Sequence, residues 1–246
     1  MSDEDTTTKP VMDKVYNDEG ADITLLSSDN VAFKVHKYHL QSHSPVFNDM
    51  LMTCSTDIPI INLSDTISEN SGAIRIFLDI IYNKQIELKF ENLGHFSNCV
   101  SFTHKYNCGV ILSALSYISW RFLDPPGSLI SPRYIYTLAG DLDNPTLAAQ
   151  AIRVSSMWGM PDLKAVKYPD NWLNANQEIL MKAGGSLGIS EGGMMDPTAW
   201  PIWEYDRISQ IYLVALNKVH RRFPLYVNHS FGDQAAKYFL ELMKAR

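Results

Sequence analysis

The sequence has few cysteines and no long uninterrupted apolar stretch. Its three cysteines, Cys54, Cys99 and Cys108, are an odd number without close pairing, which argues against a disulfide framework and predicts a reducing compartment. No run approaches the roughly 18 consecutive apolar residues that indicate a membrane-spanning helix. The start of the chain also lacks the charged and apolar segments of a secretory signal. We therefore expect a cytoplasmic or nuclear protein that does not enter a membrane.

Positive charge is also scarce. Lysine and arginine number 21 against 27 acidic residues, a net charge of −6. Residues 1–20 carry −4 of it, so the rest of the chain is nearly neutral and has no basic footprint for nucleic acid. We expect residues 1–20 to be a disordered acidic tail, in which Val11, Met12, Val15 and Tyr16 form at most a short helix with an apolar edge.

Residues 21–51 predict a β-hairpin followed by two helices. Ile23–Leu26 is an apolar run, residues 27–30 are turn-forming, and Val31–Val35 alternates apolar with polar. Two short runs joined in this way indicate a hairpin with one buried face. Ser44 is followed by a proline, which predicts a capped helix start, because proline lacks only an N–H that would be unpaired there.

The following segments predict one more strand and three helices. Ile58–Leu63 reads as a third strand, with a proline at its start where no ladder donor is lost. From Ile74 to Tyr82 the apolar residues recur with helical spacing. Two further helices are expected at about 93–106 and 110–123, and Gly109 between them is expected to take the left-handed conformation that ends a helix.

The prolines and glycine of Asp124–Ser128 predict a domain boundary. The 246 residues, 46% apolar and 20% charged, suffice for two small globular domains. We assign one to 21–123 and a mainly α-helical region to 124–246, with a Gly-rich loop at 184–201. Helices in that region are expected to begin at Pro132 and Pro145 and to span about 173–182, 204–222 and 232–244.

The opening unit resembles the BTB/POZ domain. The matching positions are Asp22, Phe33, His36, Leu40, Ser44, Phe47, Leu51 and, at the end of the following helix, Tyr82. The resemblance implies an α+β fold with a small sheet packed against helices. It also implies protein–protein association, often as a homodimer, and in some branches docking onto a cullin scaffold as a ubiquitin ligase adaptor.

The C-terminal region resembles, on spacing, the helical extension that follows the BTB domain in many fungal proteins. Two departures from the family bear on the partners. Dimers in the family commonly have a full N-terminal helix, for which Pro10–Tyr16 offers two turns at most. Cullin-binding members often carry a hydrophobic-x-Glu pattern where this chain has Ile74-Arg75-Ile76, and Ile76 in place of the glutamate weakens the prediction of a cullin partner.

A competing function is a serine hydrolase. Gly184–Gly188 matches the G-x-S-x-G elbow around Ser186, and Asp206 and His220 follow in the order that α/β-hydrolases use. That chemistry requires the serine on a strained turn between a buried strand and a helix. Here a helical pattern precedes the motif and a glycine-rich loop follows it, which favours a chance match.

Neither a metal site nor a cofactor is expected. His36, His39 and His43 have helical spacing, but His36 ends a strand and no nearby cysteine or carboxylate completes a ligand set. The cysteines are expected to be buried and inert, because no third group orients a neighbouring histidine for thiol catalysis.

The sequence therefore favours a non-catalytic interaction protein, with the hydrolase or a transcriptional regulator acting through partners as alternatives. The candidate partner surface comprises Ile74 and Leu78 in the first half and Trp200 and Trp203 beside the Gly-rich loop. Aromatic side chains of this kind commonly anchor partners.

Overall fold

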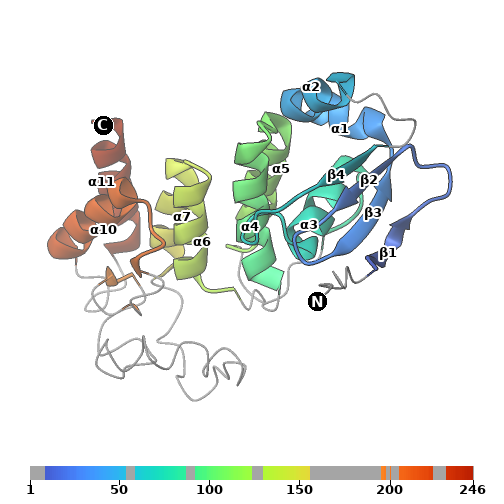
Figure 1. Cartoon of the computed structure of the whole chain (residues 1–246). Coiled ribbons are helices and arrows are strands. Elements are labelled where there is room, and N and C mark those ends of the chain that lie inside the picture. The colour runs from blue at the N-terminus through green and yellow to red at the C-terminus, as the bar shows by residue number, and fades with distance from the viewer. Residues whose placement is uncertain are drawn as a thin grey trace, which may run out of the picture. The chain divides into compact units, whose positions relative to one another are not determined.

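A computed structural model shows two compact units, Met1–Leu115 and Ser116–Arg246 (Figure 1). The division lies within helix α5 (Gly109–Trp120), a few residues before the boundary that the sequence predicts. The structure describes the residues in the ranges 9–53, 59–86, 92–123, 130–155, 195–197, 200, 205–223 and 231–245.

The first unit is built on a mixed four-stranded sheet in the order β1-β3-β2-β4. Strands β2 (Ile23–Leu26) and β3 (Val31–Val35) form the predicted antiparallel hairpin, with Leu25 opposite Phe33. Strand β4 (Ile60–Asn62) runs parallel to β2 at one edge of the sheet. The three expected strands are therefore present, and the sequence missed a fourth.

That fourth strand is β1 (Val11–Asn17), which runs parallel to β3 at the other edge. The prediction of a disordered tail or short helix is wrong for these residues. The register is interrupted between Met12 and Asn17, and within β1 only Asp13 and Tyr16 are buried. Buried residues three positions apart are typical of one edge of a helix. Here the spacing of Asp13 and Tyr16 results from an irregular strand whose two buried side chains contact helix α3.

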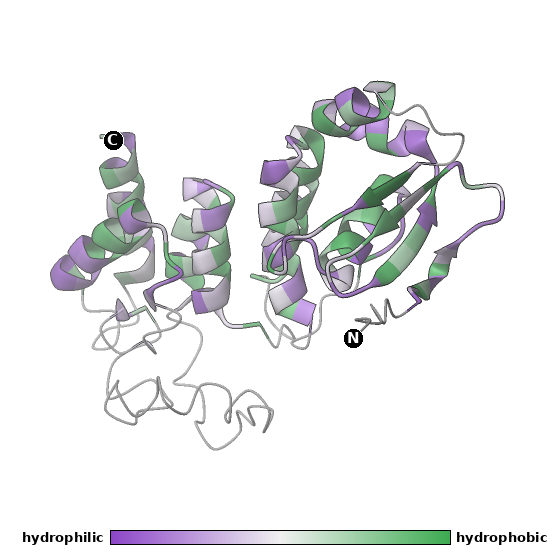
Figure 2. Cartoon of the chain, in the orientation of Figure 1, coloured by the Kyte–Doolittle hydropathy of each residue, from purple (hydrophilic) through white to green (hydrophobic). Residues whose placement is uncertain are grey.

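Helices cover the sheet and supply the core of this unit. They are α1 (Lys37–His43), α2 (Pro45–Thr53), α3 (Ser71–Ile81), α4 (Leu93–Lys105) and the start of α5. The rings of Phe47, Phe77 and Phe102 lie 5.0–6.3 Å apart, which joins α2, α3 and α4. Figure 2 shows hydrophobic residues concentrated along the central strands and alternating with polar ones along the helices. The unit is α+β, as predicted.

The turn between α4 and α5 differs from the prediction. Asn107, and not Gly109, has the left-handed conformation, with φ of 53°. Gly109 is the first residue of α5. Asparagine tolerates this conformation better than most residues because its short polar side chain bonds locally. The sequence placed the turn correctly and chose the wrong residue within it.

The second unit is helical in its described part. Its helices are α6 (Pro132–Asp141), α7 (Pro145–Ser155), α10 (Gln210–Arg222) and α11 (Gly232–Lys244). The predicted helix starts at Pro132 and Pro145 are present, and each is capped by the side chain before it. Ser131 accepts from the Arg133 N–H at 3.2 Å and Asn144 from the Leu147 N–H at 3.0 Å. The expected helix at 173–182 and most of the 184–201 loop lie outside the described residues.

The core of this unit is aromatic. The rings of Tyr136, Tyr212 and Phe239 meet with centroids 5.7–6.2 Å apart, and the Tyr136 hydroxyl donates to the Tyr212 carbonyl at 2.8 Å. Within the described part of the chain, no helix has the length and apolar character that a bilayer crossing requires.

Candidate interaction surface

Asp22 and Tyr82 fix the junction between the hairpin and α1. The Asp22 carboxylate accepts a hydrogen bond from the N–H of Lys37, the first residue of α1, at 2.7 Å. The Tyr82 hydroxyl accepts from the His36 N–H at 2.9 Å and lies 3.1 Å from His36 Nδ1. These bonds connect the end of β3 to the C-terminal end of α3, although His36 and Tyr82 are 46 residues apart.

Ser44 fixes α2 in the same way. Its hydroxyl oxygen accepts from the Phe47 N–H at 3.0 Å and donates its own hydrogen to the Tyr106 carbonyl at 2.5 Å. The Phe47 ring stacks on the Tyr106 ring with centroids 4.2 Å apart. One serine therefore caps a helix and ties it to the end of α4.

The predicted family positions are brought together as supports of the fold. Asp22, His36, Ser44 and Tyr82 make the bonds described above. The remaining four, which are Phe33, Leu40, Phe47 and Leu51, are buried in the core. None of these four apolar side chains is available to a partner, so a partner surface must involve other residues of the unit.

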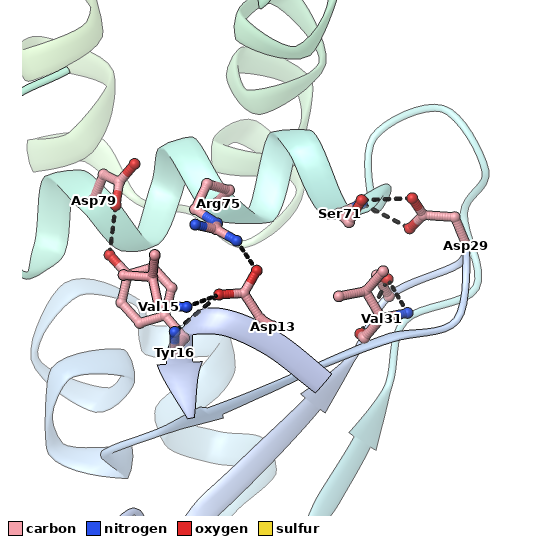
Figure 3. A network of polar contacts seen from close by, with 9 residues as sticks. Asp13, Val15, Tyr16, Asp29, Val31, Ser71, Arg75 and Asp79 are labelled. Atoms are coloured by element: carbon pink, nitrogen blue, oxygen red, sulfur yellow. Dashed lines mark hydrogen bonds and ion pairs between the residues drawn. The ribbon is translucent and has the colours of Figure 1, made fainter. Parts of the chain in front are cut away.

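Strand β1 is held against α3 by side chains (Figure 3). The Asp13 carboxylate accepts from the N–H groups of Val15 and Tyr16 at 2.8 Å and pairs with the Arg75 guanidinium. The Tyr16 hydroxyl donates to Asp79 at 2.7 Å. Burial, followed by this contact, raises the pKa of Tyr16, so the phenol remains a donor at neutral pH. We call these contacts the β1 latch.

The latch buries Asp13 and Tyr16 and leaves the apolar side chains of β1 exposed. Val11 is 66% exposed and Val15 is 51% exposed, and Met12 is also exposed. We call these three residues the apolar edge of β1. The sequence predicts Val11, Met12 and Val15 to form an apolar edge, but in a tail that is expected to be disordered.

The predicted partner surface is wrong for the residues that can be assessed. Ile74 and Leu78 are fully buried, because the apolar stripe of α3 faces the core of its own unit. Trp200 is also buried, and its ring meets Tyr136 edge to face with centroids 6.3 Å apart. Trp203 lies outside the described residues. Ile76, at the position where cullin-binding relatives often have glutamate, is buried as well.

The hydrolase hypothesis gains no support from the described residues. Ser186 lies outside them. His220 Nε2 lies 3.5 Å from a carboxylate oxygen of Asp196, so its carboxylate neighbour differs from the predicted Asp206, which is exposed. This contact joins α10 to the segment before it.

Of the three cysteines, the structure describes Cys99 and Cys108, whereas Cys54 lies outside the described residues. Within the described ranges no group of histidine, cysteine and acidic side chains is arranged to hold a metal ion. Cys99 and Cys108 are buried free thiols. Burial raises the pKa of Cys99 and raises that of Cys108 to about 11. Since the thiolate is the reactive form, both are poor nucleophiles.

The architecture of the first unit agrees with a match to a known family. Residues 12–113 match the model of the BTB/POZ domain family. These residues form a BTB/POZ domain. The match begins within β1 and ends within α5, so the strand that the sequence assigned to a tail belongs to the BTB domain. No curated protein matches the chain.

BTB domains are generally protein–protein interaction modules and not enzymes. The first unit is therefore an interaction module. The exposed large apolar residues of its described sheet are Val11, Met12 and Val15 on β1 and Ile60 on β4. The helices α6, α7, α10 and α11 follow the BTB domain in the chain.

Proposed function

We propose that the chain is a non-catalytic protein whose BTB domain self-associates through the apolar edge of β1. The observation that carries the proposal is the position of Val11, Met12 and Val15. They are exposed on an outermost strand, yet the β1 latch holds that strand in place. A fixed apolar edge can be buried by a second copy without ordering a flexible segment first.

Burial of the apolar edge in a symmetric contact releases enough free energy for association. Burying one exposed valine or methionine side chain contributes about 1.5–3 kcal/mol, as an upper range for complete burial. A two-fold interface buries each residue twice, so the apolar edge supplies several times that amount. Positional entropy opposes association by at least about 4 kcal/mol, which the combined burial exceeds.

The test is the molar mass of the full chain in solution by light scattering. We expect a dimer for the natural chain and a monomer for Val15→Lys, because a lysine in the middle of the interface would be buried without a partner. Met52→Lys is the matched control: Met52 is 76% exposed, but it lies on α2. A natural chain that is monomeric, or a Val15→Lys variant that still dimerises, would overturn the proposal.

The adaptor role is a further part of the proposal. It rests on the family alone, and Ile76 is buried where relatives often have glutamate. Adding a purified cullin N-terminal domain to the same light-scattering experiment tests it. A complex of increased mass supports an adaptor, and unchanged mass favours another partner, such as a component of transcriptional regulation. We also propose that the C-terminal helices are the extension found in fungal BTB proteins.

A further inference from the structure

Four rings in the BTB domain form a continuous series, which we call the aromatic ladder. It runs from Tyr16 through Tyr82 and His39 to Tyr38, with successive centroids 5.3, 4.2 and 4.0 Å apart. These distances are those of attractive edge-to-face and offset-stacked pairs, or slightly shorter. The ladder joins β1, the C-terminal end of α3 and α1, and each ring is supported by the next.

The inner end of the ladder already holds cations. The Arg75 guanidinium carbon lies 5.7 Å from the centroid of the Tyr16 ring, and Lys84 Nζ lies 4.1 Å from it. Both distances fall within the range of a cation–π contact. Asp79 accepts the hydrogen bond of the Tyr16 hydroxyl beside them. At this end, the domain combines an aromatic ring, a carboxylate and a basic side chain.

At the outer end an exposed ring lies beside an imidazole, and that imidazole lies near a carboxylate. Tyr38 is 59% exposed, and its ring rests on His39. The His36 ring lies 5.9 Å from the Tyr38 ring, and Asp18 Oδ2 is 3.9 Å from His36 Nε2. The neighbouring Lys37 is directed to a different acid, since its Nζ lies 4.0 Å from Asp22. Asp18 is largely exposed, and Glu19, which follows it in the sequence, is exposed as well.

We infer that the outer end of the aromatic ladder binds an arginine side chain presented by a segment of another protein. A guanidinium stacks on an aromatic face and pairs with a carboxylate at the same time. Because Tyr38 is already packed on His39, little side-chain freedom is lost on binding. The inference rests on the proposal that the domain acts by binding proteins, but it does not require self-association.

A short peptide of alternating glycine and arginine tests the inference by NMR titration of the full chain. The matched ligand replaces each arginine by citrulline, which has nearly the same shape and no charge. We expect the arginine peptide to shift the resonances of Tyr38, His39 and Asp18 in a saturable way and the citrulline peptide to leave them unchanged. Equal binding of both peptides, or no saturable shift at these residues, would overturn the inference.

Two variants and one control separate the site from general attraction to an acidic protein. Tyr38→Ala is expected to weaken binding by about two- to fivefold, the effect of one exposed cation–π contact, while Tyr38→Phe retains it. Tyr117→Ala is the control, because Tyr117 is 71% exposed on α5, a helix without acidic residues. The inference fails when Tyr117→Ala has the same effect as Tyr38→Ala. Light scattering shows whether Tyr38→Ala keeps the molar mass of the natural chain, so weaker peptide binding can be told apart from a loss of self-association.

Discussion

Ser44 shows how much of this fold depends on one small side chain. A serine before a proline is a local signal for a helix start, and the structure confirms it through the bond to the Phe47 N–H. The second bond, to the Tyr106 carbonyl, joins residues 62 positions apart. No local pattern predicts that bond, yet both use the same oxygen atom.

We expect Ser44→Ala to lower the free energy of unfolding by about 1–3 kcal/mol, because it removes a helix cap and leaves the buried Tyr106 carbonyl with only the weak thiol donor of Cys108. Urea denaturation measures the change. Ser42→Ala is the matched control: its hydroxyl donates to the His39 carbonyl at an exposed position, and the expected change is within about 0.5 kcal/mol. Equal losses in the two variants would contradict the assigned role of Ser44.

The cysteines give a second prediction for single residues. In the native chain, Cys99 and Cys108 are expected to resist maleimide, because burial excludes the reagent and raises the pKa of both thiols, that of Cys108 to about 11. In denaturant both should react fully. Mass spectrometry of the labelled peptides reads each cysteine separately. Rapid native labelling of either residue would show that it is accessible.

Among the elements, β1 is the one whose position the sequence concealed. Its ladder pairing with β3 is interrupted, and side-chain contacts to α3 replace the missing backbone bonds. Those contacts involve Arg75 and Asp79, about 60 positions later in the chain. A strand fixed in this way depends on a few specific side chains and not on hydrophobic alternation.

Breaking the β1 latch should therefore loosen this strand selectively. Arg75→Met leaves the buried Asp13 carboxylate without its cation, and we expect a loss of about 1–3 kcal/mol. This is less than the 3–5 kcal/mol of a fully buried pair, because a third of the Arg75 side chain is exposed. Hydrogen exchange at residues 11–17 should accelerate more than exchange in β2.

The control for the latch is Arg121→Met, which removes an exposed arginine at the end of α5. It should leave exchange in β1 unchanged. The double variant Asp13→Asn with Arg75→Met should recover part of the loss, since no buried charge then lacks a partner. Uniform acceleration across the whole sheet in Arg75→Met would indicate general destabilisation and contradict a local latch.

For the molecule as a whole, acid stability is governed in part by Glu69. This buried carboxylate accepts from the Tyr106 hydroxyl at 2.6 Å, the Asp65 N–H at 2.7 Å and Lys105 Nζ at 2.7 Å. Burial acts to raise the pKa of Glu69, but the hydrogen bonds from Lys105, Tyr106 and Asp65 outweigh it and lower the pKa below its ordinary 4.5. Hydrogen bonds likewise outweigh burial and lower the pKa of Asp29.

A lowered pKa means that the unfolded chain binds the proton more tightly than the folded chain. The stabilisation by Glu69 is then fully present above the unfolded value of about 4.5 and is lost as the pH falls through the lower folded value. Denaturation midpoints measured from neutral pH downward should fall in this window. Glu69→Gln should flatten the decline and be less stable at neutral pH, whereas Glu19→Gln, at an exposed position, should match the natural chain.

The hairpin, the cap at Ser44, the helix starts at Pro132 and Pro145 and the resemblance to the BTB/POZ domain could all be predicted from the sequence. These features arise from alternation, helical spacing and capping residues, which act between neighbours in the chain. The place of β1 in the sheet became clear only in the folded structure. The same holds for the inward orientation of Ile74 and Leu78 and for the exposed Tyr38 ring packed on His39. Each of these features depends on contacts between segments far apart in the chain, and local sequence patterns do not predict the free energy of such contacts.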